Sequence, residues 1–596
     1  MSALHKLFPP RGAIRRSERG PTPTATDGGE STRARPRSGV QADLQSRIIK
    51  AGPTAVLAAS GPARRAGDIR MPASRPALLW ISLLALLLVA APYAAGFVFA
   101  PHGLVFLGAL NNLGDAGQYL AALRQGAEGH LLYTNQYSSV RSGPVLIYPL
   151  YTIGGLLLGG LHLPAPAMYY LVQAAAAVAL LAALYRFSSV VLPNNILLCY
   201  GLIVFGGGLY LPVLLLSGLL VLPFQAVALT APEYSTFATL LLSPHGTAGL
   251  AGEVWAVTGY LLYQIEGRRR HLASLAAGGL LLGLSYPFGL PVLLAVMAVD
   301  LAIRHGWLVA QTGGRRGRVQ PNLRLLVPPA LALIPAFAVA AYYGLLFLLD
   351  PLWSGSNLLR LPPPGLAVLA AAFGPLLILA ARAVPTLRTR LQVDGTGRLM
   401  LVWAVVNGLL LLAPLPQSER LCAGWSIPLA VLAAIHLARL PLRSARRWVL
   451  GLSMSNVTMA LLYLAVAVSG TNSGYYASRD QMAAVDWLAA HSGPGDVVMA
   501  SAGSGNLIVS AARCHVVVGQ NFQTFHWAQA QADVWRFFNA TTPRAERAAV
   551  LRRQRVSYVL AGPYERAIGA FDPATDPAYR LAFASGAVRV FSVESG

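Results

Sequence analysis

Long apolar runs recur along this chain from Leu78 to Val468, and they constrain its fold more than any other feature. A helix needs about 20 apolar residues to cross a hydrocarbon core of about 30 Å. Hydrophobic residues make up 55% of the sequence and charged residues only 12%. The sequence therefore predicts an all-α polytopic membrane protein.

The net charge of +23 comes almost entirely from arginines in the N-terminal tail and in short loops between apolar runs. This distribution is typical of topology signals and does not indicate a nucleic-acid partner. Only two lysines occur, which favours a GC-rich bacterial genome as the source. We therefore place the protein in a bacterial cytoplasmic membrane.

Arginine clusters alternate with loops that have few basic residues, and this alternation predicts the topology. Basic loops stay in the cytoplasm. Placing the arginine clusters inside and the loops with few basic residues outside gives about 13 transmembrane helices. The N-terminus is then inside, and residues after about 470 are outside. The basic clusters lie at 268–270, 304–318, 382–390 and 439–447, and the outer loops at 101–142, 226–245, 285–287, 349–363 and 414–420.

Composition divides the chain into three parts. Residues 1–75 are rich in Arg, Pro, Gly and Ser, which predicts a disordered basic cytoplasmic tail. Residues 76–470 form the transmembrane domain, with its first outer loop at 101–142. In residues 471–596 short apolar strands alternate with amphipathic helices, which predicts a small extracytoplasmic α/β domain. The Gly503-Ser-Gly505-Asn506 segment is interpreted as a tight turn, because it lacks the third glycine of a dinucleotide-binding loop.

Asp115 is the leading candidate for chemistry, because it follows the first apolar run at the outer face. A carboxylate there could take a proton from an acceptor hydroxyl, or hold a divalent cation against a phosphate leaving group. Alternatively, Asp115 caps a helix that begins at Ala116, since Asp is a favoured N-cap residue. The spacing leaves both interpretations open.

Other ionisable residues fall in the outer loops or at membrane depth. Arg124 and Arg141 could bind phosphate or lipid headgroups. Glu233 lies in an outer loop, and His245 precedes a span that carries Glu253, for which it is a candidate partner. His245 is either a catalytic group or an interfacial hydrogen-bonding residue. Glu419 and Arg420 form either a local ion pair or a clamp on a lipid phosphate.

The layout resembles the C-type membrane glycosyltransferases, which include protein O-mannosyltransferases, oligosaccharyltransferase catalytic subunits and bacterial enzymes that use polyprenyl-phosphate sugars. The resemblance covers most of residues 75–596 and is carried mainly by this layout. The segments similar to those of uncharacterised bacterial members are Asp115-Ala-Gly-Gln-Tyr119 through Gly126, Tyr148-Pro-Leu-Tyr151, Glu419-Arg420 and Gly519-Gln-Asn-Phe-Gln-Thr524.

The resemblance implies an enzyme that moves a sugar, a hexose or a pentose, from a polyprenyl-phosphate donor to an extracytoplasmic glycan, lipid or protein acceptor of the cell envelope. By position, Asp115 matches the acid that serves as base or metal ligand in that superfamily. The paired acid of several members is missing here, so dependence on Mg²⁺ or Mn²⁺ stays open and no metal ligands are assigned. The expected site residues are, as catalytic groups, Asp115, Glu233 and His245, and, as substrate-binding groups, Arg124, Arg141, Glu419 and Arg420.

Two other classes of protein stay open. A transporter or lipid flippase would place ionisable residues deep in its spans, and Glu253 and Asp300 are the candidates for that. A non-enzymatic protein that binds envelope polymer would rely on the large C-terminal part alone.

Overall fold

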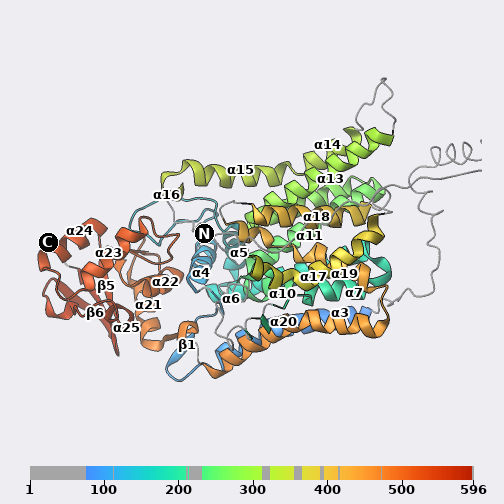
Figure 1. Ribbon diagram of the computed structural model, residues 1–596. Helices are drawn as coiled ribbons and strands as arrows, with labels where there is room; N and C mark the ends of the chain where they lie inside the picture. The colour runs from blue at the N-terminus through green and yellow to red at the C-terminus, as the bar shows by residue number, and fades with distance from the viewer. Residues whose placement is uncertain are drawn as a thin grey trace, which may run out of the picture. The chain divides into compact units, whose positions relative to one another are not determined.

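The computed structural model describes residues 75–593, apart from Asn112, most of 210–230, and the segments 312–322, 355–364, 389–394, 414–416 and 471–472. The predicted tail lies outside these residues except for Arg75. The described residues are mostly helical and belong to one compact unit (Figure 1).

Seven helices are long and apolar enough to cross a membrane: Arg75–Val98, Ala165–Val191, Pro287–Gly306, Leu366–Leu387, Gly395–Leu412, Ser418–Leu437 and Leu442–Ser469. Three shorter apolar helices span Pro149–Leu161, Pro193–Phe205 and Ile334–Leu349. The multi-pass membrane class is therefore supported. A total of 13 spans is not confirmed by the described residues.

The helices up to residue 349 are α3 (Arg75–Val98), α4 (Leu113–Ala127), α5 (Pro149–Leu158), α6 (Ala165–Val191), α7 (Ile196–Phe205), α10 (Thr236–Leu242), α11 (Pro244–Glu266), α12 (Arg270–Ser285), α13 (Leu290–Gln311), α14 (Leu323–Ala332) and α15 (Ile334–Leu349). They are followed by α16 (Pro351–Ser354), α17 (Leu366–Arg388), α18 (Gly395–Leu412), α19 (Ser426–Leu437) and α20 (Leu442–Ser469).

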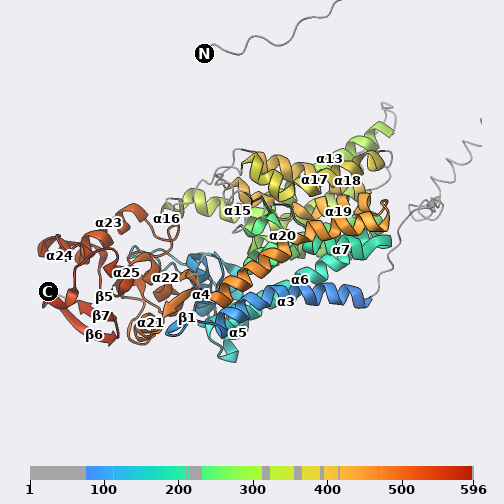
Figure 2. The same cartoon turned by 60° about the horizontal axis from the view of Figure 1, so that its bottom comes forward.

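The first and last long apolar helices, α3 and α20, lie side by side in both views (Figures 1 and 2). The outer face of α3 leaves large apolar side chains uncovered, among them Trp80 at 70% and Leu87 at 64% exposure. In a membrane these side chains would contact lipid tails, which are as apolar as leucine. The exposed apolar surface of α3 is therefore the surface expected of a helix that borders lipid.

Helices α11 and α12 pack so closely that their contact face admits little more than glycine. A Cβ atom on Gly252 would lie 2.7 Å from the carbonyl oxygen of Gly278, and one on Gly278 would lie 2.5 Å from the carbonyl oxygen of Gly252. Small residues of this kind let helix backbones approach inside a membrane. This packing holds α11 in place, and α11 carries two of the ionisable residues singled out above, His245 and Glu253.

The first outer loop is tied to the C-terminal part of the chain by a small sheet. Strand β1 (Leu104–Phe106) pairs antiparallel with β2 (Tyr476–Ser478), with Leu104 opposite Ser478. An isolated antiparallel bridge then joins Tyr133 to Val145. The loop that carries Asp115 is thus fixed at both of its ends.

The C-terminal part contains a five-stranded sheet in the order β4-β3-β5-β7-β6. Strand β3 is parallel to both β4 and β5, whereas β7 runs antiparallel to β5 and β6. The strands are β3 (Val497–Met499), β4 (His515–Val516), β5 (Tyr558–Ala561), β6 (Tyr579–Ser585) and β7 (Val588–Val593), and the helices are α21 (Arg479–His491), α22 (Ala502–Ala511), α23 (Trp527–Phe538), α24 (Arg544–Gln554) and α25 (Pro563–Arg566).

The interpretation of Gly503–Asn506 as a tight turn is wrong, because these residues belong to helix α22. Ser501 caps the helix by accepting the N–H of Ser504 at 3.2 Å. The buried carboxylate of Glu565 accepts hydrogen bonds from the N–H of Ser501 at 2.9 Å and from the hydroxyl of Ser504 at 2.6 Å. The helix start is therefore already held by a carboxylate of the chain itself, at the place where a nucleotide phosphate would bind.

Candidate functional site

Asp115 lies in the first turn of α4, which begins at Leu113. It therefore does not cap a helix that begins at Ala116, because an N-cap residue has non-helical backbone angles. Gly114, also in this turn, leaves room for Gln520, whose Nε2 would lie 3.0 Å from a Cβ atom at this position.

Two side-chain amides converge on one oxygen of Asp115. Nε2 of Gln520 donates to Oδ1 at 2.5 Å, and Nε2 of Gln118 donates to the same oxygen at 3.4 Å. Hydrogen bonds to a carboxylate favour its charged form and fix its orientation. Asp115 is thus held as an oriented anion by residues from two distant parts of the chain.

Tyr148 and Gln523 extend this network. Gln523 donates through Nε2 to the hydroxyl of Tyr148 at 2.6 Å, and that hydroxyl donates to Oε1 of Gln118 at 3.1 Å. The segment 519–524 therefore contacts Asp115 directly through Gln520. It also contacts Tyr148, which in turn binds Gln118, the second amide at Asp115. Tyr148 itself has a left-handed backbone (φ 60°) immediately before α5.

The segment 519–524 is fastened to the first outer loop by further hydrogen bonds. Asn135 donates to the carbonyl of Gln523 at 2.7 Å, and Thr524 donates to the carbonyl of Tyr137 at 2.9 Å. A side chain at Gly519 would collide with the Tyr137 ring at 2.4 Å. The amides that orient Asp115 are therefore rigidly positioned.

Tyr119, one helical turn after Asp115, is connected by contacts to two other charged residues, Glu233 and Arg420. Its hydroxyl lies 3.5 Å from Nε2 of His245, whose ring stacks on Tyr286 with centroids 6.1 Å apart. Tyr286 in turn donates to Glu233, the ion-pair partner of Arg420. Burial raises the pKa of the Tyr119 phenol well above the usual range, the negative charges of Asp115 and Glu233 raise this pKa further, and the positive charge of Arg420 lowers it.

His245, at the start of α11, is enclosed by tyrosines. Its Nδ1 lies 3.0 Å from the hydroxyl of Tyr151, and its Nε2 lies 3.5 Å from the hydroxyl of Tyr119. The Tyr119 and Tyr151 rings stack with centroids 4.4 Å apart. His245 contacts these tyrosines instead of Glu253, so the expected pairing of His245 with Glu253 is wrong.

Glu233 and Arg420 form an ion pair between two short 3-10 turns, Pro232–Tyr234 and Ser418–Cys422. Nη1 of Arg420 lies 3.0 Å from Oε1 of Glu233. The hydroxyl of Tyr286 donates to the same oxygen at 2.9 Å, and Phe288 lies beneath the guanidinium at 5.4 Å. The expected local pairing of Glu419 with Arg420 is therefore replaced by a pairing of Glu233 with Arg420.

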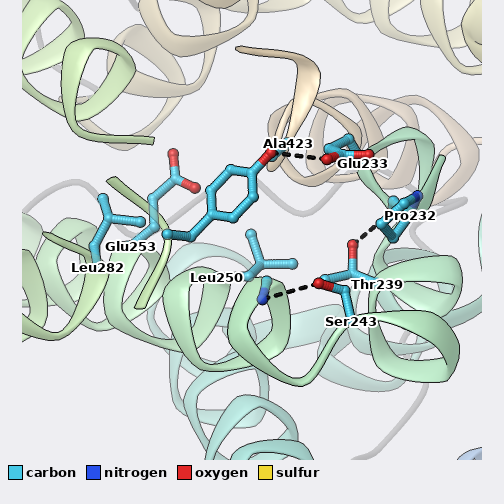
Figure 3. Close-up of a pocket in the computed structure, with 10 residues that line it drawn as sticks. Pro232, Glu233, Thr239, Ser243, Leu250, Glu253, Leu282 and Ala423 are labelled. Atoms are coloured by element: carbon cyan, nitrogen blue, oxygen red, sulfur yellow. Dashed lines mark hydrogen bonds between the residues drawn. The ribbon is translucent and has the colours of Figure 1, made fainter. Parts of the chain in front are cut away.

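Glu253 lines a small cavity together with Glu233, Thr239 and Ser243 (Figure 3). Glu253 is 2% exposed, and its Oε1 has no hydrogen-bond partner among the described residues. Gly424 (φ +80°) passes close by, and a Cβ atom on it would lie 2.5 Å from the carboxylate. The cavity has room for about one water molecule, so it is too small for a sugar.

The remaining predicted residues lie apart from this centre or face other groups. Arg124 binds Glu128 at 3.1 Å and Gln136 at 2.6 Å, and it thereby supports the outer loop. Arg141 donates to the carbonyl of Gly495 at 3.0 Å. Glu419 is half-buried in the turn that carries Arg420. Contacts thus link Glu233, His245 and Arg420 through Tyr286, whereas Arg124 and Arg141 have other partners.

In the part of the chain that the structure describes, no three His, Cys, Asp or Glu side chains gather in a metal-binding arrangement. Two amide N–H groups donate to Oδ1 of Asp115, and such donors complement an anion.

Gln520 and Gln523 are the site residues that reasoning from single residue types missed. Neutral amides carry no catalytic signature of their own, and they lie some 400 positions from Asp115 in sequence. The one signal that included them is the segment 519–524, which was part of the resemblance stated above.

No protein-family profile matches this sequence, and no curated protein matches it. Solved structures do resemble it. The Archaeoglobus fulgidus oligosaccharyltransferase in its apo form has a TM-score of 0.48 and 14% identity, over 87% of this chain and 74% of that chain. AglB of the same organism, in complex with an inhibitory peptide and a dolichol-phosphate, has a TM-score of 0.49 and 13% identity over 81% and 69%. ArnT from Cupriavidus metallidurans, bound to undecaprenyl phosphate, has a TM-score of 0.45 and 12% identity, over 86% of this chain and 98% of that chain.

With TM-scores of 0.45–0.49 and identities of 12–14%, these likenesses do not indicate an activity for this chain. The chemistry of this chain therefore has to follow from its own residues.

Proposed function

We propose that the protein is a membrane glycosyltransferase that moves a sugar from a polyprenyl-phosphate donor to an extracytoplasmic acceptor. In this proposal about 13 spans hold the N-terminus in the cytoplasm, and residues 471–596 form an α/β domain on the outer face. The proposal is supported by a carboxylate that two amides orient, Asp115, one helical turn before Tyr119. It is also supported by a guanidinium, Arg420, which contacts link to the same tyrosine through Glu233, Tyr286 and His245.

Asp115 acts as the general base. Its Oδ1 accepts both amide hydrogen bonds, which fix the orientation of the carboxylate that takes the proton. Proton transfer by a positioned side chain contributes about 10²–10⁴-fold to a reaction rate. The amides hold the carboxylate still and keep it charged, and both properties suit a base.

Arg420 binds the phosphate of the donor. Glu233 engages Nη1 at 3.0 Å and Gln417 engages Nε at 3.1 Å, and both contacts fix the plane of the guanidinium. The structure gives Nη2 no protein partner among the described residues. The side chain is 29% exposed. A guanidinium fixed in this way can still donate to a phosphate oxygen.

The reaction is a single displacement with balanced charges. The acceptor oxygen loses its proton to Asp115 and forms a bond to the anomeric carbon of the sugar. The bond between that carbon and the phosphate oxygen breaks, and polyprenyl phosphate leaves with one more negative charge than it had in the diester. Arg420 stabilises this charge as it develops.

Four buried polar atoms around Asp115 indicate where the acceptor binds. They are the hydroxyl of Tyr137 and the amide oxygens of Asn506, Asn521 and Gln523, and they have no hydrogen-bond partner in the described part of the chain. Buried polar groups are normally satisfied. Amide oxygens accept hydrogen bonds, so they complement an acceptor that presents several hydroxyl or N–H groups.

A transporter would need free ionisable residues deep in its spans, and one of the two candidates for this role, Asp300, is already paired. Asp300 pairs with Arg398 at 2.8 Å and accepts the hydroxyl of Tyr260 at 2.7 Å, so it is a satisfied structural residue between helices. Glu253 is the other candidate, and no described residue gives it a charged partner.

The donor can be tested in membranes that contain the protein. One sample receives a radiolabelled sugar on polyprenyl phosphate, and a second receives the nucleotide sugar in membranes stripped of polyprenyl phosphate. The proposal predicts label in an acceptor fraction only in the first sample. Consumption of the nucleotide sugar in the second sample would overturn it. Mass analysis of envelope glycans in a deletion strain then identifies the acceptor.

A further inference from the structure

A second pocket lies far from the candidate site, along the same helix. It is lined by Arg186 of α6, Trp255 and Thr258 of α11, and Arg270 and His271 at the start of α12. Thr258 is about 20 Å from His245 along α11, at about 1.5 Å per residue. The pocket therefore faces the other end of the helix bundle, on the side where arginines gather.

The pocket has an excess of positive charge. Arg268, Arg270 and His271 share one carboxylate, Glu266, at distances of 3.0–3.4 Å. Arg186 has no carboxylate within 4.0 Å among the described residues. One carboxylate, Glu266, thus pairs with three basic side chains. A fourth basic side chain, Arg186, lines the pocket without a carboxylate partner among the described residues.

The floor of the pocket is polar and buried. Thr258 is 3% exposed and His271 is 5% exposed. Gly259 lets α12 approach, since a Cβ atom there would lie 2.7 Å from the carbonyl oxygen of His271. At the rim, Trp255 is 49% exposed, as is typical of tryptophan at the level of lipid headgroups.

The start of α12 borders the pocket. Arg269 precedes the helix and makes no side-chain capping hydrogen bond. The N–H groups of His271 and Leu272 already donate to the carbonyls of Arg268 and Arg269, so this helix start favours an anion through its dipole. Guanidinium groups, a helix start and a concave polar floor thus occur together at one place.

We propose that this pocket binds a phosphate group, carried either by an anionic phospholipid or by a soluble phosphate compound. Basic pockets between membrane helices on the side rich in arginine suit such headgroups. The proposal does not depend on the glycosyltransferase reaction, because it uses no residue of the candidate site.

Native mass spectrometry of the full-length protein tests the proposal. The protein is titrated with phosphatidylglycerol, with phosphatidylcholine, and with inorganic phosphate in a neutral detergent. Arg186→Gln is expected to weaken binding of phosphatidylglycerol or phosphate at least about tenfold. The matched control is Arg268→Gln, which removes a guanidinium that shares Glu266 but does not line the pocket.

The arms of the experiment separate the sources of the phosphate. Selective binding of phosphatidylglycerol identifies a lipid, whereas binding of inorganic phosphate with no gain from the lipid identifies a soluble compound. Arg186→Lys checks that the pocket still folds. We expect this variant to bind with intermediate affinity, because it keeps the positive charge but loses the planar guanidinium that donates two hydrogen bonds. Equal binding in the wild type, Arg186→Gln and Arg268→Gln would overturn the proposal, as would an equal loss in both Gln variants.

Discussion

The side-chain amide of Gln520 donates a hydrogen bond of 2.5 Å to Oδ1 of Asp115, although the two residues are 405 positions apart in sequence. This contact joins the C-terminal part of the chain to the helix that carries the proposed base. It gives the C-terminal part a role in orienting the base, in addition to any role in binding the acceptor.

Replacing Gln520 by Leu removes this hydrogen bond with little change in volume. We expect kcat to fall about 10–100-fold, because a misplaced catalytic group loses much of its effect. The acid limb of the pH–rate profile should also move to higher pH, because the charged carboxylate loses a donor. Gln529→Leu, on the exposed face of α23, is the control. An unchanged pH profile in Gln520→Leu would show that Gln520 does not orient the base.

Replacing Arg420 by Lys keeps the charge but removes the planar fork. We expect the KM for the lipid-linked donor to rise about tenfold, and Arg420→Gln to raise it further, because a phosphate contact is lost in each case. Steady-state kinetics with varied donor concentration measures both. Arg443→Lys, at an exposed position of α20, should behave as the wild type. Because Arg420 also stabilises the charge that develops on the leaving phosphate, kcat should fall as well. An unchanged KM and an unchanged kcat in Arg420→Gln would contradict the assignment to phosphate binding.

Glu565 holds the start of α22 through hydrogen bonds from Ser501, Ser504 and Gly562. Replacing it by Gln puts an N–H donor against at least one of these donors, so we expect the free energy of unfolding of this region to drop by about 1–3 kcal/mol. Hydrogen exchange of the α22 amides measures the local opening. Glu546→Gln, whose carboxylate is 50% exposed, should leave this exchange unchanged. Protection of α22 that is as strong in Glu565→Gln as in the wild type would contradict the role given to Glu565.

His515 makes stability depend on pH. Burial lowers its pKa below the usual range, while the contact of Nδ1 with the carbonyl of Ser138, at 2.9 Å, acts in the opposite direction. The unfolded chain then takes up the proton first, so stability is full above the unfolded pKa of about 6.5 and is lost as the pH falls below it.

Melting temperatures of the wild type and of His515→Gln between pH 5 and 8 test this dependence. Acidification should destabilise the wild type more than His515→Gln, and His526→Gln, at an exposed position, should follow the wild type. Parallel curves for the wild type and His515→Gln would show that His515 does not cause the dependence.

Local patterns predicted much of the helical architecture and part of the C-terminal region. Residues 471–596, for which the sequence predicts short strands that alternate with amphipathic helices, contain helix α21, capped by Ser478, and strands β3 and β7. Helix α22 was missed because two glycines within 503–506 suggested a turn. In the structure these glycines serve close packing, since a Cβ atom on Gly505 would lie 2.0 Å from the carbonyl oxygen of Val518.

Hydropathy could not settle the number of spans. Helix α11 contains glycines, threonines and Glu253, so it falls below the apolarity of the clear spans, yet most of its residues are buried against α6 and α12. Hydropathy reports how readily a helix can face lipid. The position of α11 depends instead on packing against neighbouring helices, which hydropathy does not report.

The sequence singles out candidate residues for the site but not their pairing. Asp115, Glu233, His245 and Arg420 were singled out by residue type and by outer-loop position. That Glu233 pairs with Arg420, and that tyrosines enclose His245, depends on contacts between residues up to 187 positions apart, which no local pattern encodes. Arg124 illustrates the converse, since its charge suggested phosphate binding but its partners are Glu128 and Gln136.

The central claim is that Asp115 takes the proton of the acceptor. Asp115→Asn keeps the shape and a hydrogen-bonding oxygen but removes the base, and Glu128→Gln is the matched control, because this acid lies at the far end of the same loop helix and binds Arg124 and Arg513. The measurement is the rate of sugar transfer from a labelled polyprenyl-phosphate donor, normalised to protein inserted in the membrane. The account predicts a loss of about 10²–10⁴-fold in Asp115→Asn and near wild-type transfer in Glu128→Gln. Full transfer by a correctly inserted Asp115→Asn variant would contradict it.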